Sequence, residues 1–529
     1  MNVALLHPAG ARRLEAFVYL EGDAYPAHSS MKQVFISAFL ILSVCSVLTA
    51  MWRPESQSAK PVLYWVTNPQ ETRNRQARAF ADWLERTHQR QVDFRIDADN
   101  HDLRKKIIQG VAGVAGDLID FRSGDHMRFA HAVGMVADVT EIAGAKGFPA
   151  HLTYDAAVPE FVFEGRQYGF PAGSFIHMYW VNEATFEQYD LPLPQERMSL
   201  GEFEALGREF VARANPEGER RQNFFLYGAG TFIANALRRG MGGDMYNETL
   251  TAARLDAEPS LEAMRIIHRW IHEYGLLPSD ADMASFAAEQ HGDAHVAMPL
   301  FVRGHFALLL WGRSAVTYFR PLGLDTRLSV IEPPNAGFPN TSMGVRIVTI
   351  YENARNREMA EYFLEYLTSE DYNVIIAEEG EDMPPNPAFA RTDAFLHPPD
   401  YPNEWGAHET FARAAEEIAI GEPFSPYILP GIAHRMWARG YSEIMSGRRS
   451  IEEAMQIATQ RIAAEIAASI SHPDNEALLS HYRRAVEDQR RIDERLAAGE
   501  PIPLSLIRNP YYRRYYLSTG QAYRDESAL

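Results

Sequence analysis

Residues 61–96 read PVLYWVTNPQETRNRQARAFADWLERTHQRQVDFRI and contain hydrophobic patterns of two different periods. The stretch begins with the apolar run PVLYWV, which is typical of a buried strand, and ends with VDFRI, which alternates as a strand does. Between these runs, residues 76–87 have apolar side chains at helical spacing. One helical face would carry four of them: Ala77, Phe80, Ala81 and Leu84. The order predicts a β-α-β unit and therefore an α/β fold.

The same alternation of elements continues along the chain. Residues 103–111 have the pattern of a helix, residues 117–121 (DLIDF) have that of a strand, and similar pairs follow to about residue 375. From about 376 to 470 the pattern is mostly helical, and residues 451–469 predict one amphipathic helix. We therefore expect an α/β body followed by a mostly helical C-terminal part.

The N-terminal region predicts an encounter with a membrane. Residues 34–52, VFISAFLILSVCSVLTAMW, carry no charge and follow Met31-Lys32, as the apolar part of a signal sequence does. The small residues at 48–50 (LTA) suit cleavage, while an uncleaved anchor and lipidation at Cys45 remain alternatives. Residues 1–33 form an N-terminal extension, unless translation starts at Met31. Each version places residues 53–529 outside the cytoplasmic membrane, in the periplasm, secreted or anchored.

Composition excludes several classes of partner. The chain has 529 residues, enough for two to four domains, and 51 basic against 70 acidic residues give a net charge of −19. It has no Lys/Arg-rich tract, so we expect no nucleic-acid partner. Cys45 is the single cysteine, which excludes an internal disulfide and Cys-based metal or redox sites.

Catalytic motifs are missing from the sequence. The glycines between 110 and 116 have the wrong spacing for a dinucleotide loop, and GxxxxGK[ST], GxSxG and HExxH do not occur. The histidine pairs 126/131 and 291/295 are more typical of solvated or capping residues than of metal ligands. Acidic pairs such as 378–379 do not distinguish a glycosidase from a solvated surface. We therefore expect no enzyme activity, no cofactor and no metal.

Seven segments occur in an order that carries more information than any one of them. They are 61–70 (PVLYWVTNPQ), 116–119 (GDLI), 129–140 (FAHAVGMVADVT), 168–192 with YGFP and MYWVN, 301–312, 343–364, and 446–455 with SG and IEEAM. In this order they resemble the extracellular solute-binding proteins of bacterial ABC importers, in the sugar-binding branch of the maltose-binding protein family. The resemblance covers most of residues 61–470.

This resemblance implies a type II periplasmic-binding-protein-like fold, with two α/β lobes and a ligand cleft between them. Residues 61–173 with 342–375 would form lobe 1, and residues 174–320 with 376–470 would form lobe 2. The chain would cross between lobes near 173–175, 315–342 and 370–376. Residues 473–529 lie outside the resemblance. Their charged helix and five tyrosines predict a strap packed on one lobe, with a docking element as the alternative.

The resemblance also implies a function and a site. A monomer would capture a carbohydrate, an oligosaccharide, by lobe closure and deliver it to permease subunits of an ABC transporter. Aromatic rings would stack on the sugar's C–H faces, and polar groups would bind its hydroxyls. The residues at matching positions are Trp65, Asn68, Ser123, Asp125, Ser174, Phe175, Phe232, Asn235, Trp311, Arg313 and Arg346. From the residue types alone, Trp65 and Phe232 suit a core as well as a cleft, and Asn68 and Asp125 suit loop turns.

Departures from the family pattern leave the ligand open. Ser314 stands where the family often has Trp, and Glu183 replaces the usual Lys. Alternatives are a binding protein of the same fold for a polyamine, a metal chelate or a peptide, and an anchored envelope glycoside hydrolase, which would need a carboxylate pair. A protein that signals to a membrane receptor is a further alternative.

Overall fold

The computed structural model describes residues 60–68, 71–97, 102–218, 220–289, 297–322, 327–429, 431–472 and 475–525. The predicted N-terminal extension (1–33) and the signal or anchor segment (34–52) lie outside these residues. Within the described part of the chain, no helix is both long and apolar enough to cross a membrane.

The first lobe is built on a six-stranded sheet of order β12-β11-β3-β1-β2, with β6 beside β11. Its strands are β1 (Val62–Val66), β2 (Asp93–Asp97), β3 (Leu118–Phe121), β6 (Phe170–Ile176), β11 (Thr341–Ile350) and β12 (Ala419–Gly421). β1 runs parallel to β2 and β3, and helix α2 (Glu71–His88) connects β1 to β2. The predicted β-α-β unit is thus confirmed.

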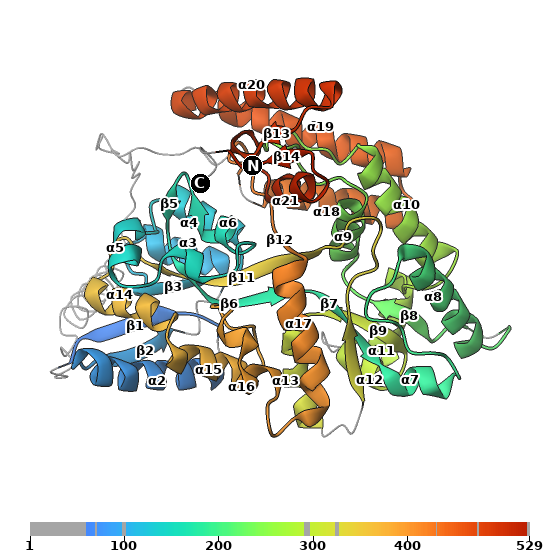
Figure 1. The fold of residues 1–529 in the computed structure, drawn as a ribbon, viewed down its shortest axis with the longest axis horizontal. Helices are drawn as coiled ribbons and strands as arrows, with labels where there is room; N and C mark the ends of the chain where they lie inside the picture. The colour runs from blue at the N-terminus through green and yellow to red at the C-terminus, as the bar shows by residue number, and fades with distance from the viewer. Residues whose placement is uncertain are drawn as a thin grey trace, which may run out of the picture. The chain divides into compact units, whose positions relative to one another are not determined.

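Helices cover both faces of this sheet (Figure 1). Leu63 and Trp65 of β1 face the layer that contains α2, α14 (Arg357–Tyr366) and α15 (Glu370–Glu379). Val66 faces the opposite layer, which contains α4 (Gly124–Ala132) and α6 (Val158–Phe161). This alternation follows from the two-residue period of a strand. The first lobe also contains α3 (Leu103–Val111), α5 (Thr140–Ala145), β4 (Val162–Phe163) and β5 (Arg166–Gln167).

The second lobe is built on a four-stranded sheet of order β10-β7-β9-β8. Its strands are β7 (Met178–Asn182), β8 (Phe224–Tyr227), β9 (Phe306–Trp311) and β10 (Leu328–Ile331). The helices of this part are α7 (Glu183–Gln188), α8 (Leu200–Ala214), α9 (Gly230–Gly240), α10 (Glu258–His272), α11 (Asp280–Glu289), α12 (Ala297–Val302) and α13 (Val316–Phe319). Ser199 and Glu202 form a capping box that starts α8.

Three crossing segments connect the two sheets. The first is residues 176–178, since β6 continues to Ile176 and only His177 separates it from β7. The second is residues 332–340, between β10 and β11, and the third is residues 417–422, where α17 (Trp405–Glu417) leads into β12. Residues 370–376, where the sequence places the third crossing, lie in α15, which packs against α2. β12 joins the first sheet, although the sequence groups residues 376–470 with lobe 2.

The C-terminal part is helical, as expected. It contains α16 (Asp393–Leu396), α17, α18 (Ile432–Met445), α19 (Ile451–Ile470), α20 (Glu476–Ala498) and α21 (Pro510–Ser518), with the short strands β13 (Ile502–Pro503) and β14 (Ala522–Tyr523). The single helix predicted at 451–469 is α19. In Figure 1, α20 lies along one edge with β13, β14 and α21 beneath it.

The C-terminal extension packs on the second lobe and on two of the crossings. The Tyr511 hydroxyl donates a hydrogen bond to the carbonyl of Arg239 at the end of α9 (2.7 Å), and the Tyr516 hydroxyl donates to Glu248 (2.6 Å). Tyr515 meets Phe338 of the second crossing at 5.3 Å. Arg514 donates to the carbonyl of Ala419 in β12. These contacts make the extension an integral layer of the fold.

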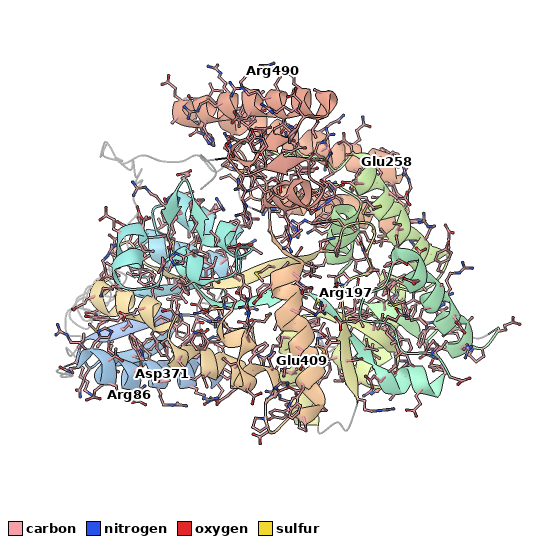
Figure 2. All side chains as sticks on the ribbon, in the orientation of Figure 1. Arg86, Arg197, Glu258, Asp371, Glu409 and Arg490 are labelled. Carbon is pink, nitrogen blue, oxygen red and sulfur yellow. The ribbon has the colours of Figure 1, made fainter. Side chains whose placement is uncertain are left out.

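Charged side chains on the outside are largely paired with one another. Arg86 of α2 pairs with Asp371 of α15, and Arg490 of α20 pairs with Glu487 and Glu494 of the same helix (Figure 2). Exposed pairs of this kind contribute little to stability, about 0–1 kcal/mol each. The charged face of α20 is therefore mainly a solvated surface.

Candidate functional site

Three aromatic rings run from the first crossing to the start of α9. The imidazole of His177 stacks on Phe232, with ring centroids 4.2 Å apart and an interplanar angle of 26°. Phe175 meets His177 edge-on, at 5.9 Å and 89°. Phe232 is 41% exposed, and Phe175 and His177 are half-buried. We call Phe175, His177 and Phe232 the aromatic row.

The aromatic row depends on a glycine in β11, the strand of the first lobe that pairs with β6. Gly344 pairs with Phe175 across the antiparallel register of β6 and β11. A Cβ atom built on Gly344 would come within 2.4 Å of Phe175 Cζ. Only glycine therefore leaves room for this ring to lie against the strand.

Burial lowers the pKa of His177 to about 4, so its imidazole is neutral at pH 7. Its Nδ1 atom is buried and has no hydrogen-bond partner among the described residues. A neutral imidazole adds ring surface to the row, while its buried Nδ1 atom is left without a partner in the described part of the chain.

A polar cluster lies one helical turn beyond Phe232. Asn235 donates hydrogen bonds to Ser342 Oγ of β11 at 2.9 Å and to Glu422 Oε1 at 3.3 Å. Arg239 donates to the same Ser342 oxygen at 3.1 Å and lies 3.6 Å from Glu422 Oε1. The Glu422 side chain is 35% exposed. We call Asn235, Arg239, Ser342 and Glu422 the hinge polar cluster, because α9, the start of β11 and the third crossing segment contribute to it.

The first lobe reaches this region through the N-terminus of α4. The Ser123 hydroxyl accepts a hydrogen bond from His126 N at 3.4 Å and caps the helix. Asp125 Oδ2 accepts one from Gly431 N at 2.9 Å, so this helix contacts the segment that follows β12. Burial raises the pKa of Asp125. The first lobe and the C-terminal segment therefore meet at a carboxyl group.

Glu160 lies behind the same helix end and is almost fully buried. Its carboxyl accepts a hydrogen bond from Gly124 N. Burial, together with the charge of Glu422, raises the pKa of Glu160 to about 8, against the effect of that hydrogen bond. Glu160 is thus neutral at pH 7, and it lies within electrostatic reach of the hinge polar cluster.

Trp65 and Arg346 belong to a different environment. Trp65 is fully buried, with its ring 5.1 Å from Phe363 and its Nε1 donating to Asp120 Oδ1 at 2.5 Å. Arg346 is 1% exposed; its Nη1 donates to Asp120 Oδ2 at 3.2 Å, and its Nε lies 3.5 Å from Asp382 Oδ2. The structure places both side chains in the interior of the first lobe rather than at a surface.

Asn68 joins the same buried network through Arg73. Its Oδ1 accepts from Arg73 Nε at 3.2 Å, and Arg73 Nη2 pairs with Glu381 Oε1 at 2.6 Å. Two guanidinium groups therefore stand among three carboxylates, those of Asp120, Glu381 and Asp382. We call these residues with Trp65 the buried ion network: Trp65, Arg73, Asp120, Arg346, Glu381 and Asp382. A buried charge needs partners, and these charges supply one another.

Arg313 is also internal. It is 1% exposed and donates to His408 Nδ1 at 3.2 Å and to the carbonyls of Ala377 and Asp382 at 2.6 and 2.8 Å. Its guanidinium lies 4.4 Å from the centroid of the Phe395 ring. Burial lowers the pKa of Arg313 to about 9. The side chain secures the segment after α15 and does not face a surface.

Ser174 and Trp311 lie close to the row without joining it. Ser174 is fully buried, pairs through its backbone with Met383, and its Oγ has no hydrogen-bond partner among the described residues. Trp311 is half-buried against the core of the first crossing. Gly312 follows it, and its backbone lies near Phe175 Cβ.

The sequence-predicted residues thus separate into groups. The structure brings Phe175, Phe232 and Asn235 together and places Ser123 and Asp125 on the facing helix end. It places Trp65, Asn68, Arg346 and, separately, Arg313 in buried polar networks, where each side chain is bonded to internal partners.

Sequence reasoning missed His177, Arg239, Ser342 and Glu422. His177 carries a weak signal, as a single polar residue between the apolar runs FPAGSFI and MYWVN. The sequence gives no signal for Ser342 or Glu422, because only the meeting of distant strands brings them together.

No protein-family model matches the sequence, and no curated protein matches it either. Solved structures do match the fold. An ABC substrate-binding protein from Listeria monocytogenes in complex with cycloalternan is 15% identical, with a TM-score of 0.63, over 77% of this chain and 99% of that chain. The sugar-binding protein MalE from Xanthomonas citri is 12% identical, with a TM-score of 0.62, over 77% of this chain and 98% of that chain. A cyclic alpha-maltosyl-1,6-maltose binding protein from Arthrobacter globiformis is 17% identical, with a TM-score of 0.61, over 77% of this chain and 99% of that chain.

The fold is therefore that of the type II periplasmic binding proteins, and the predicted fold class is confirmed. The proteins it resembles are sugar-binding and maltodextrin-binding ABC substrate-binding proteins, so the resemblance derived from the sequence holds at the level of the fold. These structural neighbours are binding proteins rather than enzymes.

Proposed function

We propose that this protein is an extracytoplasmic solute-binding protein that captures a carbohydrate, an oligosaccharide, by lobe closure. The observation that carries the proposal is the aromatic row beside the hinge polar cluster, in a fold whose solved neighbours are sugar-binding proteins. The captured sugar would pass to the permease of an ABC transporter. The protein would act as a monomer, with residues 34–52 directing it to the membrane.

The chemistry of the site suits a sugar. The C–H faces of a pyranose pack on flat rings, and Phe232 offers such a face at 41% exposure. Hydroxyl groups pair with amides and with carboxylates, and bonds to a charged partner are the stronger ones. The half-exposed Glu422 supplies a carboxylate, and the buried Asn235, one turn beyond Phe232, donates to it at 3.3 Å and holds it in place.

The position of the site suits capture by closure. The aromatic row and the hinge polar cluster lie on α9, on two crossing segments and on the adjoining strands β6 and β11, and the α4 end of the first lobe reaches the same region through Gly431. A ligand shifts the open and closed populations only if it binds them unequally. Groups that come from both lobes and from the crossings are the ones whose spacing changes on closure.

A cationic ligand such as a polyamine is the second candidate. Asp125, Glu160 and Glu422 bring three carboxyl groups to one region, and the pKa of Glu160 is raised by burial first and also by the charges of Glu422 and Asp125. A bound ammonium group would favour ionisation of these carboxyls. The envelope glycoside hydrolase, which also needs carboxyls, would consume its ligand.

The test is a thermal-shift and calorimetric screen of residues 53–529 with maltodextrins, cyclic glucans, other oligosaccharides, polyamines and metal chelates. A ligand at 100 times its Kd stabilises the folded state by about 2.7 kcal/mol, which moves Tm by a few degrees. A shift with an oligosaccharide that chromatography recovers intact supports capture. A shift only with polyamines, or hydrolysis of the sugar that binds, would overturn the proposal.

A further inference from the structure

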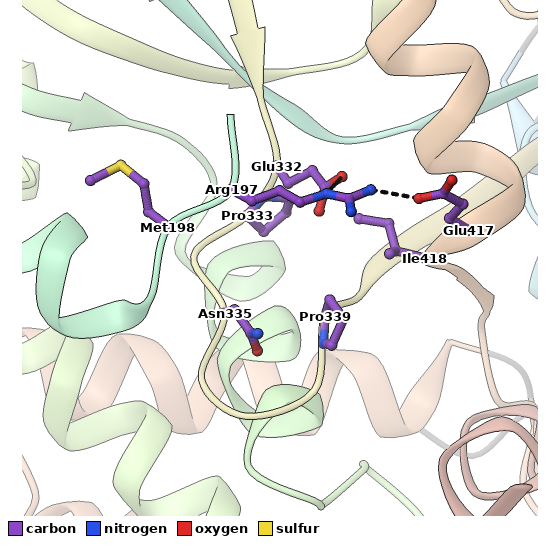
Figure 3. A pocket seen from close by; sticks show the side chains of 8 residues that line it. All are labelled: Arg197, Met198, Glu332, Pro333, Asn335, Pro339, Glu417 and Ile418. Carbon is purple, nitrogen blue, oxygen red and sulfur yellow. Dashed lines mark hydrogen bonds and ion pairs between the residues drawn. The ribbon is translucent and has the colours of Figure 1, made fainter. Parts of the chain in front are cut away.

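A cavity of about 380 Å³ lies beside the second and third crossings, away from the aromatic row. It is lined by Arg197, Met198, Glu332, Pro333, Asn335, Pro339, Glu417 and Ile418. Figure 3 shows these side chains around the space, with Arg197 paired to Glu417 at one side. The volume falls in the lower range of small-molecule sites, about 300–1,000 Å³. We call this space the hinge pocket.

The walls of the hinge pocket are held by backbone hydrogen bonds between distant segments. Asn335 N donates to the Met198 carbonyl at 2.8 Å, and Glu332 N donates to the Glu196 carbonyl at 2.9 Å. Thr341 N donates to the Ile418 carbonyl at 3.0 Å, which joins the second crossing to the third. The pocket is therefore a preformed feature of the crossings rather than a gap between loose loops.

The lining combines apolar walls with one deeply buried carboxylate. Met198, Pro333, Pro339 and Ile418 supply hydrocarbon surface. Glu332 is only 4% exposed, yet Arg197 Nε at 2.9 Å and Arg413 Nη1 at 2.7 Å both bind its Oε1 atom. Both guanidinium groups donate to the same oxygen, Oε1, and neither of these two hydrogen bonds occupies Oε2. One acceptor of a buried carboxylate is thus left for a ligand.

The charge balance around the pocket is negative. Three carboxylates, those of Glu196, Glu332 and Glu417, surround two guanidinium groups, those of Arg197 and Arg413. Burial raises the pKa of Glu332, the hydrogen bond and charge of Arg197 lower it, and the charge of Glu417 adds a smaller upward effect. A cation would complete the pairing, whereas an anion would meet an excess of like charge.

We propose that the hinge pocket is a second small-molecule site, which takes a small organic cation such as a short alkylammonium ion. The alkyl chain packs against Met198, Pro339 and Ile418, and the ammonium group donates to Glu332 Oε2. This site is independent of the sugar site, because the two share no residue. Occupancy would hold the second and third crossings at one spacing.

The test uses three probes of similar size: n-butylammonium, n-butanol and butyrate. Calorimetry on residues 53–529 is expected to give binding of butylammonium at least tenfold tighter than binding of the other two. Hydrogen exchange is expected to slow at residues 332–341 and 417–421 when butylammonium is added. Equal binding of all three probes, or no protection in these segments, would overturn the proposal.

Two matched variants test whether the Glu332 carboxylate binds the ammonium group. Glu332→Gln keeps the shape and removes the carboxylate, and we expect at least a tenfold loss of butylammonium affinity. Glu404→Gln is the control, because Glu404 is similarly buried and is paired with Arg320 at 2.6 Å outside the pocket. Equal affinity of the Glu332→Gln variant and the unmodified protein would rule out the ammonium contact.

A third variant keeps the test decisive if Glu332→Gln fails to fold. Pro339 is exposed at the pocket edge, so Pro339→Phe fills the space without removing a buried charge. We expect this variant to keep its circular dichroism spectrum and to lose butylammonium binding. Retained binding would place the cation elsewhere on the protein.

Discussion

The aromatic row and the buried ion network use similar residue types in opposite ways. Both combine aromatic rings with polar groups, and both lie beside β6 and β11. In the row, Phe232 is 41% exposed and its stacking partner His177 keeps an unpartnered nitrogen. In the network, Trp65 is fully buried and its indole N–H is already bonded to Asp120.

The two regions differ in how many of their groups can still bind a ligand. A buried polar group must find an internal partner, and once paired it contributes to stability and has little left for a ligand. An exposed ring that keeps one face open can still gain free energy by covering it. The network should therefore respond to mutation as a core does, and the row should respond as a binding surface does.

The largest expected effect is that of Trp65→Ala. Removing this ring leaves a cavity among Phe94, Phe363 and Asp120 and leaves a buried carboxylate short of one donor. We expect a loss of about 3–5 kcal/mol in the free energy of unfolding, measured by urea denaturation. A midpoint close to that of the unmodified protein, together with weaker sugar binding, would move Trp65 into the binding site.

Arg346→Ala should have a comparable effect by a different route. The substitution leaves Asp120 and Asp382 buried without their guanidinium partner, which costs about 3–5 kcal/mol in such pairs. Thermal unfolding of this variant should be compared with that of Arg490→Ala, whose exposed pairs contribute about 0–1 kcal/mol. Similar losses in the two variants would contradict the assignment of Arg346 to a buried network.

Phe232→Ala should change binding and leave folding nearly intact. Loss of one stacking face costs about 1–3 kcal/mol of affinity by analogy with other aromatic stacking sites. Calorimetry with the sugar found by the screen measures it. Tyr523→Ala is the matched control, since Tyr523 is 43% exposed and lies on the C-terminal extension. Equal affinity in Phe232→Ala would remove the row from the site.

Glu160 predicts a pH dependence of stability. Its pKa in the folded state is about 8, above its ordinary value of 4.5, so the unfolded chain releases this proton first as pH rises. Its contribution therefore favours folding below pH 4.5 and is lost progressively between pH 4.5 and 8, at up to about 1.4 kcal/mol per pH unit. Urea midpoints of Glu160→Gln should lack this decline. An unchanged slope would show that Glu160 ionises normally.

The candidate site was predictable only in part, for physical reasons that particular residues illustrate. Phe232 and Asn235 lie in the first turns of a helix that follows a strand, where ligand groups gather in α/β folds, and Phe175 lies next to the end of strand β6. The residue type of Trp65 suits stacking on a ligand. Its place on β1, two residues from Leu63, makes it face the α2 layer instead. Ser342 and Glu422 became site candidates only because β11 and β12 meet beside α9.

The sequence by itself determined the order of strands and helices, the α/β class and the resemblance to sugar-binding proteins of ABC importers. The order and the class depend on local periodicity, which neighbouring residues carry between them, and the resemblance rests on seven short segments in a set order. Only the tertiary structure decided which polar groups were already paired, since Trp65 and Asp120 are 55 residues apart and Arg346 and Asp120 are 226 apart. A strand pattern shows that side chains alternate between two faces, and what covers each face is set by segments far away in the chain.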